Sequence, residues 1–152
     1  MKKKNGFTLI EILAVVVILA ILSLIAIPVI SKQIQQSKIH LYKEQVNRIL
    51  EASEKYMQEN DSTLPKKMLE NYDITEAPVE KITLDMLYEN KFIKESDPKN
   101  PLKSSISMDK EVAIYYNTPK NQYDVVYCIS EEYYKYYYSD DEYNSKVKVV
   151  CD

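Results

Sequence analysis

The sequence GFTLIEILAVVVILAILSLIAIPVI, from Gly6 to Ile30, is the longest apolar run of the chain. The 24 residues from Phe7 to Ile30 contain one ionisable side chain, Glu11. At about 1.5 Å per residue, a helix of this length reaches across the roughly 30 Å hydrocarbon core of a bilayer. A carboxylate at that depth costs on the order of 2.5 to 3.5 kcal/mol, so Glu11 is expected to have a function and a partner.

A cut in the backbone would create the nearest partner for Glu11. If the chain were cleaved after Gly6, Phe7 would carry a new α-amino group one helical turn before the acid, and a neighbouring copy would offer the same cation. Gly6 is the single glycine of the chain and stands between the basic residues 1–6 and the apolar run. Glycine supplies the sterically open backbone that a peptidase needs. The sequence therefore predicts pairing of amine and carboxylate between identical subunits.

Two simpler interpretations of this segment are an ordinary secretory signal and a plain signal anchor. An ordinary signal has an apolar core of about 7 to 15 residues followed by a small-residue cleavage site. Here the run is longer and carries an acid near its start. A plain anchor needs neither Glu11 nor a glycine at the boundary.

The lysine-rich leader, GFTLIE at residues 6–11, the apolar helix and Pro28 together resemble the class III signal of type IV pilins and pseudopilins, over about residues 1–30. The resemblance implies cleavage between Gly6 and Phe7 by a prepilin peptidase and N-methylation of Phe7. It also implies assembly into a helical filament, with Glu11 as the acid that sets the register. Ala20 stands where many relatives have glycine, which makes local melting of the helix less expected here, whereas Pro28 is retained.

The charge of the chain argues against nucleic acid as a partner. Twenty basic and 23 acidic residues give a net charge of -3, and removal of the leader lysines 2–4 leaves 17 minus 23, or -6. Such a surface does not bind phosphates by charge neutralisation. The leader lysines place residues 1–6 in the cytoplasm and the rest of the chain outside.

No enzyme, cofactor or metal site is predicted. His40 is the single histidine and falls on the expected long helix, and the one glycine leaves no phosphate-binding loop. Three clustered acids, Asp140, Asp141 and Glu142, leave a calcium site as an alternative, although the turn glycine of such loops is missing.

The sequence of residues 31–60 predicts the second half of a long helix, which continues past a kink at Pro28. They contain neither glycine nor proline. Apolar residues recur every three or four positions, which predicts a helix with one buried face. The members of this stripe are Ile39, Tyr42, Val46, Ile49, Leu50, Ser53, Tyr56 and Met57.

Residues 61–152 predict a globular α+β head. Residues 61–82 are expected to be irregular, and Thr83 is expected to cap a short helix up to Lys91, with Leu84, Leu87 and Tyr88 buried. Strands are expected at 112–116, 123–129 and 147–150, in an antiparallel sheet packed on the amphipathic half of the long helix. Phe92-Ile93 followed by Asp97-Pro98 resembles a connector of many Gram-positive pilins. The expected architecture is the type IV pilin fold.

The end of the chain holds two further candidate features. Cys128 and Cys151 are an even pair in an exported domain and resemble the C-terminal disulfide loop of pilins, with two free thiols as the alternative. Between them lies a tyrosine-rich acidic segment that would contact neighbouring subunits or a target, or else fold back over the sheet. Its tyrosines are Tyr133, Tyr134, Tyr136, Tyr137 and Tyr138.

The resemblance implies a structural subunit of a type IV pilus that serves adhesion, motility or biofilm formation. Its implied partners are further copies and other pilins, an inner-membrane assembly platform with an ATPase motor, and membrane lipid. The subunit would be a single-pass membrane protein before assembly and part of a cell-surface pilus afterwards. The alternatives are a pseudopilin of a type II secretion-like or DNA-uptake machine and a signal-anchored extracellular binding domain.

A Cys128–Cys151 bridge would close a loop of 24 residues. The chain-entropy account gives it about 3.4 kcal/mol. Reduction should therefore lower the melting temperature of the head by more than about 10 °C. Thermal melts with and without a reducing agent measure this, and identical melts would contradict the bridge.

Overall fold

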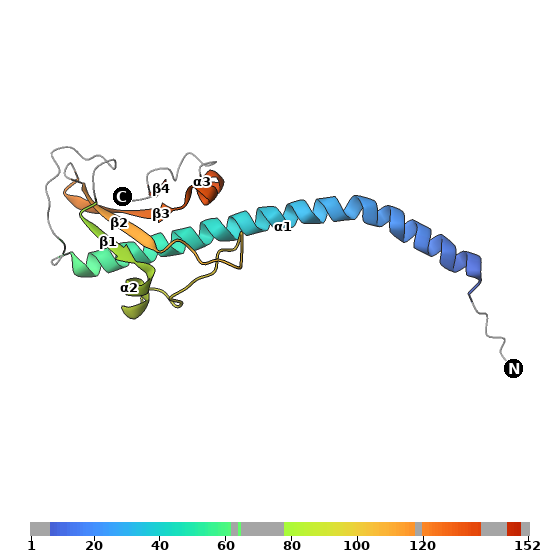
Figure 1. The fold of residues 1–152 in the computed structure, drawn as a ribbon, viewed down its shortest axis with the longest axis horizontal. Helices are drawn as coiled ribbons and strands as arrows, with labels where there is room; N and C mark the ends of the chain where they lie inside the picture. The colour runs from blue at the N-terminus through green and yellow to red at the C-terminus, as the bar shows by residue number, and fades with distance from the viewer. Residues whose placement is uncertain (1–6, 62–63, 65–77, 118–119, 138–145, 150–152) are drawn as a thin grey trace. The chain divides into compact units, whose positions relative to one another are not determined.

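The computed structural model describes residues 7–61, 64, 78–117, 120–137 and 146–149 (Figure 1). The chain divides into two compact units, Met1–Lys38 and Ile39–Asp152, which are described separately below. One long helix, α1 (Leu9–Asn60), contributes to both.

The first unit contains the apolar part of α1. Its large apolar side chains from Leu9 to Ile30 are all exposed, with exposed fractions from 50 to 86%. Among the described residues, α1 is the one helix long and apolar enough to cross a membrane, with a mean hydropathy of 3.2 in its most apolar part. The helix is unbroken at Pro28, and the kink there stays a prediction.

Two serines of this apolar helix satisfy their hydroxyl groups internally. Ser23 Oγ donates to the Leu19 carbonyl oxygen at 2.7 Å, and Ser31 Oγ donates to that of Ile27 at 2.9 Å. Each bond runs back one helical turn, so neither hydroxyl needs water. These two hydroxyl groups are therefore compatible with an apolar surrounding.

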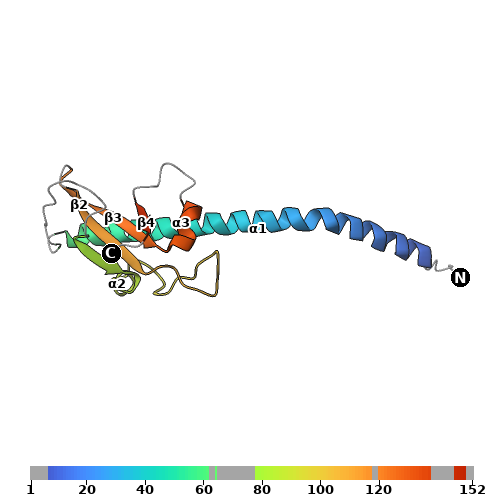
Figure 2. The same cartoon turned by 45° about the horizontal axis from the view of Figure 1, so that its top comes forward.

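The second unit begins with the amphipathic part of α1. Tyr42, Val46, Ile49, Leu50 and Ser53 are buried, which confirms the predicted stripe in its centre. The two ends of the stripe, at positions 39 and 56, are half-buried. This face forms one core with the sheet, which Figures 1 and 2 show lying against the same part of α1.

The sheet has the strand order β1-β2-β3-β4. Its strands are β1 (Glu80–Thr83), β2 (Glu111–Asn117), β3 (Gln122–Ile129) and β4 (Val147–Val149). The antiparallel pairing predicted for β2 and β3 is confirmed, for example by Ile114 opposite Val125.

Two predictions about the sheet were wrong. Residues 80–82 were expected to be irregular, yet together with Thr83 they form β1 and pair with β2. β4 was expected to be antiparallel, yet it runs parallel to β3, with Tyr127 opposite Val147. A parallel pair needs a crossover of a dozen or so residues, and the stretch from Ser130 to Lys146 is long enough to provide one.

The short helix α2 (Leu84–Glu89) has the predicted N-cap. Thr83 Oγ1 accepts a hydrogen bond from the backbone N–H of Met86 at 3.3 Å. The helix ends two residues before the predicted Lys91, whose φ of 65° lies in the left-handed region. Leu84 and Leu87 are buried as predicted, but Tyr88, expected to be buried, is 46% exposed.

A third helix, α3 (Glu131–Tyr137), lies in the tyrosine-rich segment and was not predicted. Asp109 holds its start. One carboxylate oxygen of Asp109 accepts from the backbone N–H of Ser130 at 3.0 Å, and the Asp109 carbonyl oxygen accepts from the Tyr127 hydroxyl at 2.5 Å. Asp109, in the segment before β2, is thus hydrogen-bonded both to Tyr127 of β3 and to Ser130, the residue that precedes α3.

The two central strands are buried on both faces. On the face toward α1, Val112, Ile114 and Tyr127 belong to the main core. On the opposite face, Tyr115 and Cys128 belong to a second buried cluster, together with Ala113 and Val126. All residues from Val112 to Asn117 are buried, so the burial of β2 does not alternate as it does in a sheet with one solvated face.

Replacing Tyr127 by Phe should destabilise the head, because the partly buried carbonyl of Asp109 loses its donor. The free energy of unfolding of the full chain in detergent should fall by about 1 to 2 kcal/mol at pH 7. Urea unfolding followed by circular dichroism measures this. Tyr88→Phe, at an exposed phenol, is the control and should change nothing.

The Tyr127→Phe variant should also change how the stability of the head depends on pH in the alkaline range. Burial, and then the nearby Asp109, raise the pKa of Tyr127 well above its usual value of 10.0. The unfolded chain releases this proton near pH 10 while the folded chain keeps it. Stability from the neutral phenol is therefore complete below about pH 10 and is lost above it. Tyr127→Phe should lose stability less steeply above pH 10, and equal slopes would contradict this role.

Candidate functional site

The first turn of α1 holds Glu11 in a reciprocal pair with Thr8. Glu11 Oε2 accepts from the backbone N–H of Thr8 at 2.7 Å and from its hydroxyl at 2.8 Å. In return, Thr8 Oγ1 lies 3.4 Å from the backbone nitrogen of Glu11, which donates to it. This is a capping box, in which the N-cap residue and the third helical residue satisfy each other's backbone groups.

The capping box leaves part of the carboxylate accessible. Both bonds from Thr8 end on Oε2, and among the described residues no bond to Oε1 is present. The described residues also provide no ion pair for Glu11.

The capping box lies wholly on the C-terminal side of the predicted cleavage site. Gly6 lies outside the described residues, while the next residue, Phe7, is 84% exposed. The N–H that Thr8 donates belongs to the Phe7–Thr8 peptide bond, which a cut after Gly6 leaves intact. Cleavage at the predicted site would thus add a cation beside a helix start that is already formed.

The tyrosine-rich segment packs inward in its described part. Tyr133 is 5% exposed, and its ring centroid lies 5.7 Å from that of Tyr42 on α1. Tyr134 and Tyr136 are half-buried and contact the main core. Tyr133 is therefore part of the core. The other two predicted contact tyrosines, the side chain at 137 and residue 138, lie outside the described residues, and the interaction surface stays a prediction.

The predicted disulfide is described on one side. Cys128 lies buried in β3, and Cys151 lies outside the described residues, so their pairing stays a prediction. The acids of the alternative calcium site also lie outside them. Within the described residues, no group of three or more metal-ligating side chains is present.

His40 lies on the exposed side of α1. Its Nε2 is 3.6 Å from Glu44 Oε1, one helical turn away. This is the exposed helical position that the sequence predicts for the single histidine.

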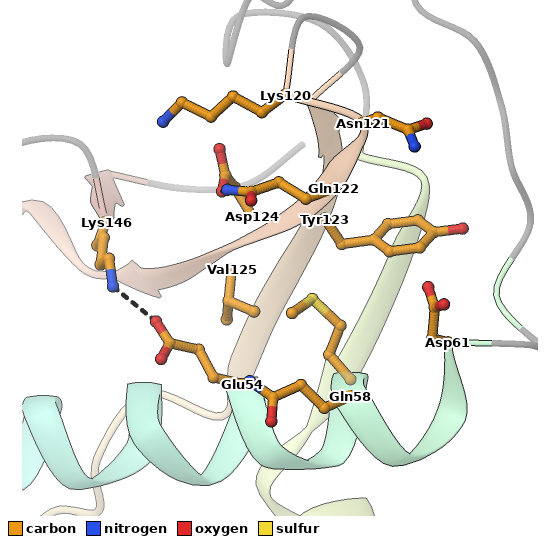
Figure 3. A pocket seen from close by; sticks show the side chains of 11 residues that line it. Glu54, Gln58, Asp61, Lys120, Asn121, Gln122, Tyr123, Asp124, Val125 and Lys146 are labelled. Carbon is orange, nitrogen blue, oxygen red and sulfur yellow. Dashed lines mark hydrogen bonds and ion pairs between the residues drawn. The ribbon is translucent and has the colours of Figure 1, made fainter.

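A polar cleft of about 700 Å³ lies between the end of α1 and β3 (Figure 3). Lys146 joins its two walls, with Nζ 2.6 Å from Glu54 Oε1. Asp61 and Lys120 also line the cleft, at the ends of α1 and of the β2–β3 turn. Its eleven lining residues include no Ser, Thr, Cys or His. These described lining residues therefore contain no Ser–His or Cys–His pair.

Sequence reasoning missed the role of Thr8, although the signal was present. The spacing Thr8-x-x-Glu11 before an apolar run is the capping-box pattern. Asp109 had no such signal, because the groups that it binds are 18 and 21 residues away in the chain.

Comparison with known proteins agrees with this N-terminal site. The family model described as the prokaryotic N-terminal methylation motif matches residues 1–27. No curated protein and no solved structure matches the chain. Residues 1–27 thus carry the prokaryotic N-terminal methylation motif, which is the class III signal of type IV pilins.

Proposed function

We propose that the chain is the structural subunit of a type IV pilus filament, assembled through its apolar helix after removal of residues 1–6. One observation carries this proposal. The part of α1 from Leu9 to Ile30, most of which lies within the methylation motif, exposes all its large apolar side chains, and its first turn carries a carboxylate that has no cation among the described residues. Both features call for other molecules around the helix.

The apolar surface needs a cover that the described head does not provide. Exposed apolar patches of this extent mark membrane or protein contact. Lipid covers the helix from Leu9 to Ile30 before assembly, and the same helices of other subunits cover it in the filament. The subunit is then a single-pass membrane protein with its leader in the cytoplasm and its head outside.

The carboxylate makes assembly directional. Two unit charges 4 Å apart attract by about 4 kcal/mol at an effective dielectric constant of about 20. This offsets the roughly 2.5 to 3.5 kcal/mol that a lone acid costs within the membrane. Glu11 of one subunit and the amine of Phe7 on the next form a head-to-tail contact, and such contacts generate open helical filaments when they do not close into rings.

The proposed partners follow from these steps of processing and assembly. A prepilin peptidase cleaves after Gly6 and methylates Phe7, and an inner-membrane platform with a cytoplasmic ATPase motor extrudes the subunits. The resulting pilus serves adhesion, motility or biofilm formation. Long, abundant surface filaments distinguish this function from a pseudopilin of a secretion or DNA-uptake machine, whose filament is short and scarce.

Mass spectrometry of the exported protein tests the processing step. The expected mature N-terminus is N-methylated Phe7. A retained leader would identify a signal-anchored extracellular domain and would overturn the filament proposal.

Three substitutions separate the charge of Glu11 from its capping role. Glu11→Gln keeps an acceptor for Thr8 but removes the charge, and Glu11→Ala removes both. Both variants should insert into the membrane at least as well as the native chain, because neither carries an acid within the apolar segment. Both should fail to enter filaments.

Thr8→Val is the matched control. It keeps the charge and the backbone N–H of residue 8 and removes one hydroxyl, so filaments should persist. Electron microscopy of sheared surface filaments is the readout. Normal filaments from Glu11→Gln would exclude the proposed pairing of amine and carboxylate.

A further inference from the structure

A second groove, of about 550 Å³, lies within the head between α1 and the segment that follows α2. One wall is α1 from Gln45 to Lys55, and the other is the segment from Phe92 to Pro98. Ile49 and Ala52 are buried beneath it. The groove thus combines an apolar floor with an open, polar rim.

The rim carries three cations. Arg48 and Lys55 are two helical turns apart on α1, so they lie on one face of the helix, and Lys94 stands on the opposite wall. All three are exposed, and none forms an ion pair with another described residue. Two acids, Glu51 and Glu95, share the rim.

This rim favours a ligand with carboxylates and aromatic rings. Arg and Lys side chains pair with carboxylates and also pack on tyrosine rings. The groove therefore fits an acidic segment of protein that contains tyrosines.

The chain itself contains such a segment. Residues 131–143 hold five acids and one lysine among their tyrosines. The first two acids, Glu131 and Glu132, are exposed on α3, next to the half-buried Tyr134 and Tyr136. In Figure 1, α3 lies on one side of α1 and α2 lies on the other, so one head presents the two surfaces in different directions.

We propose that the groove of one subunit binds α3 of the next subunit, with Arg48, Lys55 and Lys94 facing Glu131 and Glu132. This inference rests on the filament function proposed above. The two surfaces differ, so the contact is heterologous and propagates from copy to copy. The contacts between heads then repeat from subunit to subunit along the filament, as the contacts between the apolar helices do.

Charge reversal tests the contact in the full chain. Arg48→Glu with Lys55→Glu, and separately Glu131→Lys with Glu132→Lys, should each reduce the yield of surface filaments roughly tenfold or more, since the loss of about 1.4 kcal/mol per contact gives that factor. The combination of all four substitutions should restore filaments. Lys103→Glu with Lys120→Glu, at exposed lysines away from the groove, is the control and should assemble normally.

Two further measurements keep the outcomes distinct. Each variant is checked for methylated Phe7 and for its melting temperature, and the neutral pair Arg48→Gln with Lys55→Gln replaces any reversal that fails to fold. Carbodiimide treatment of native filaments should join Lys55 or Lys94 to Glu131 or Glu132, and detergent-solubilised monomers should lack these links.

Normal filaments from both reversed variants, or no rescue in the combination, would overturn the groove contact and leave the pilus function standing. Absence of filaments from the native chain would instead overturn the proposed function.

Discussion

The constraint on which the chain depends is a carboxylate placed at the start of an apolar helix. Glu11 is costly there without a cation, and the described residues provide none. Thr8 satisfies one of its oxygens and so fixes the first turn of α1. The other oxygen is left for a partner. The same few residues thus form the helix start, the methylation motif and the proposed contact between subunits.

The head depends on a change along the same helix, from side chains that are exposed on all sides to side chains that are buried on one side. From Ile39 onward, the side chains of α1 no longer face out on all sides, and Tyr42, Val46 and Ile49 enter the core with the sheet. The sheet is buried on both faces at β2 and β3, and Asp109 joins β3 to the start of α3. One continuous helix thereby exposes an apolar surface in one unit and contributes to a protein core in the other.

The sequence predicted what depends on local patterns. The apolar run, the stripe from Tyr42 to Ser53 and the Thr83 cap each rest on neighbours within a few residues. The errors about the sheet and about α3 concern contacts between distant residues. β1 is only four residues long and is specified by its pairing with β2. The direction of β4 depends on a crossover, and α3 depends on Asp109. The capping partner of Glu11 was readable as Thr8-x-x-Glu11, whereas the groove at Arg48 required the fold.

The parallel strand β4 has a consequence for the order in which the head is completed. It is the last of the described strands and pairs with the edge of β3 through three residues, Val147 to Val149. Because synthesis proceeds from the N-terminus, β3 has an open edge until residues 147–149 have emerged. An incomplete chain therefore presents a strand edge that can pair with other chains, and a truncated subunit would carry that edge permanently.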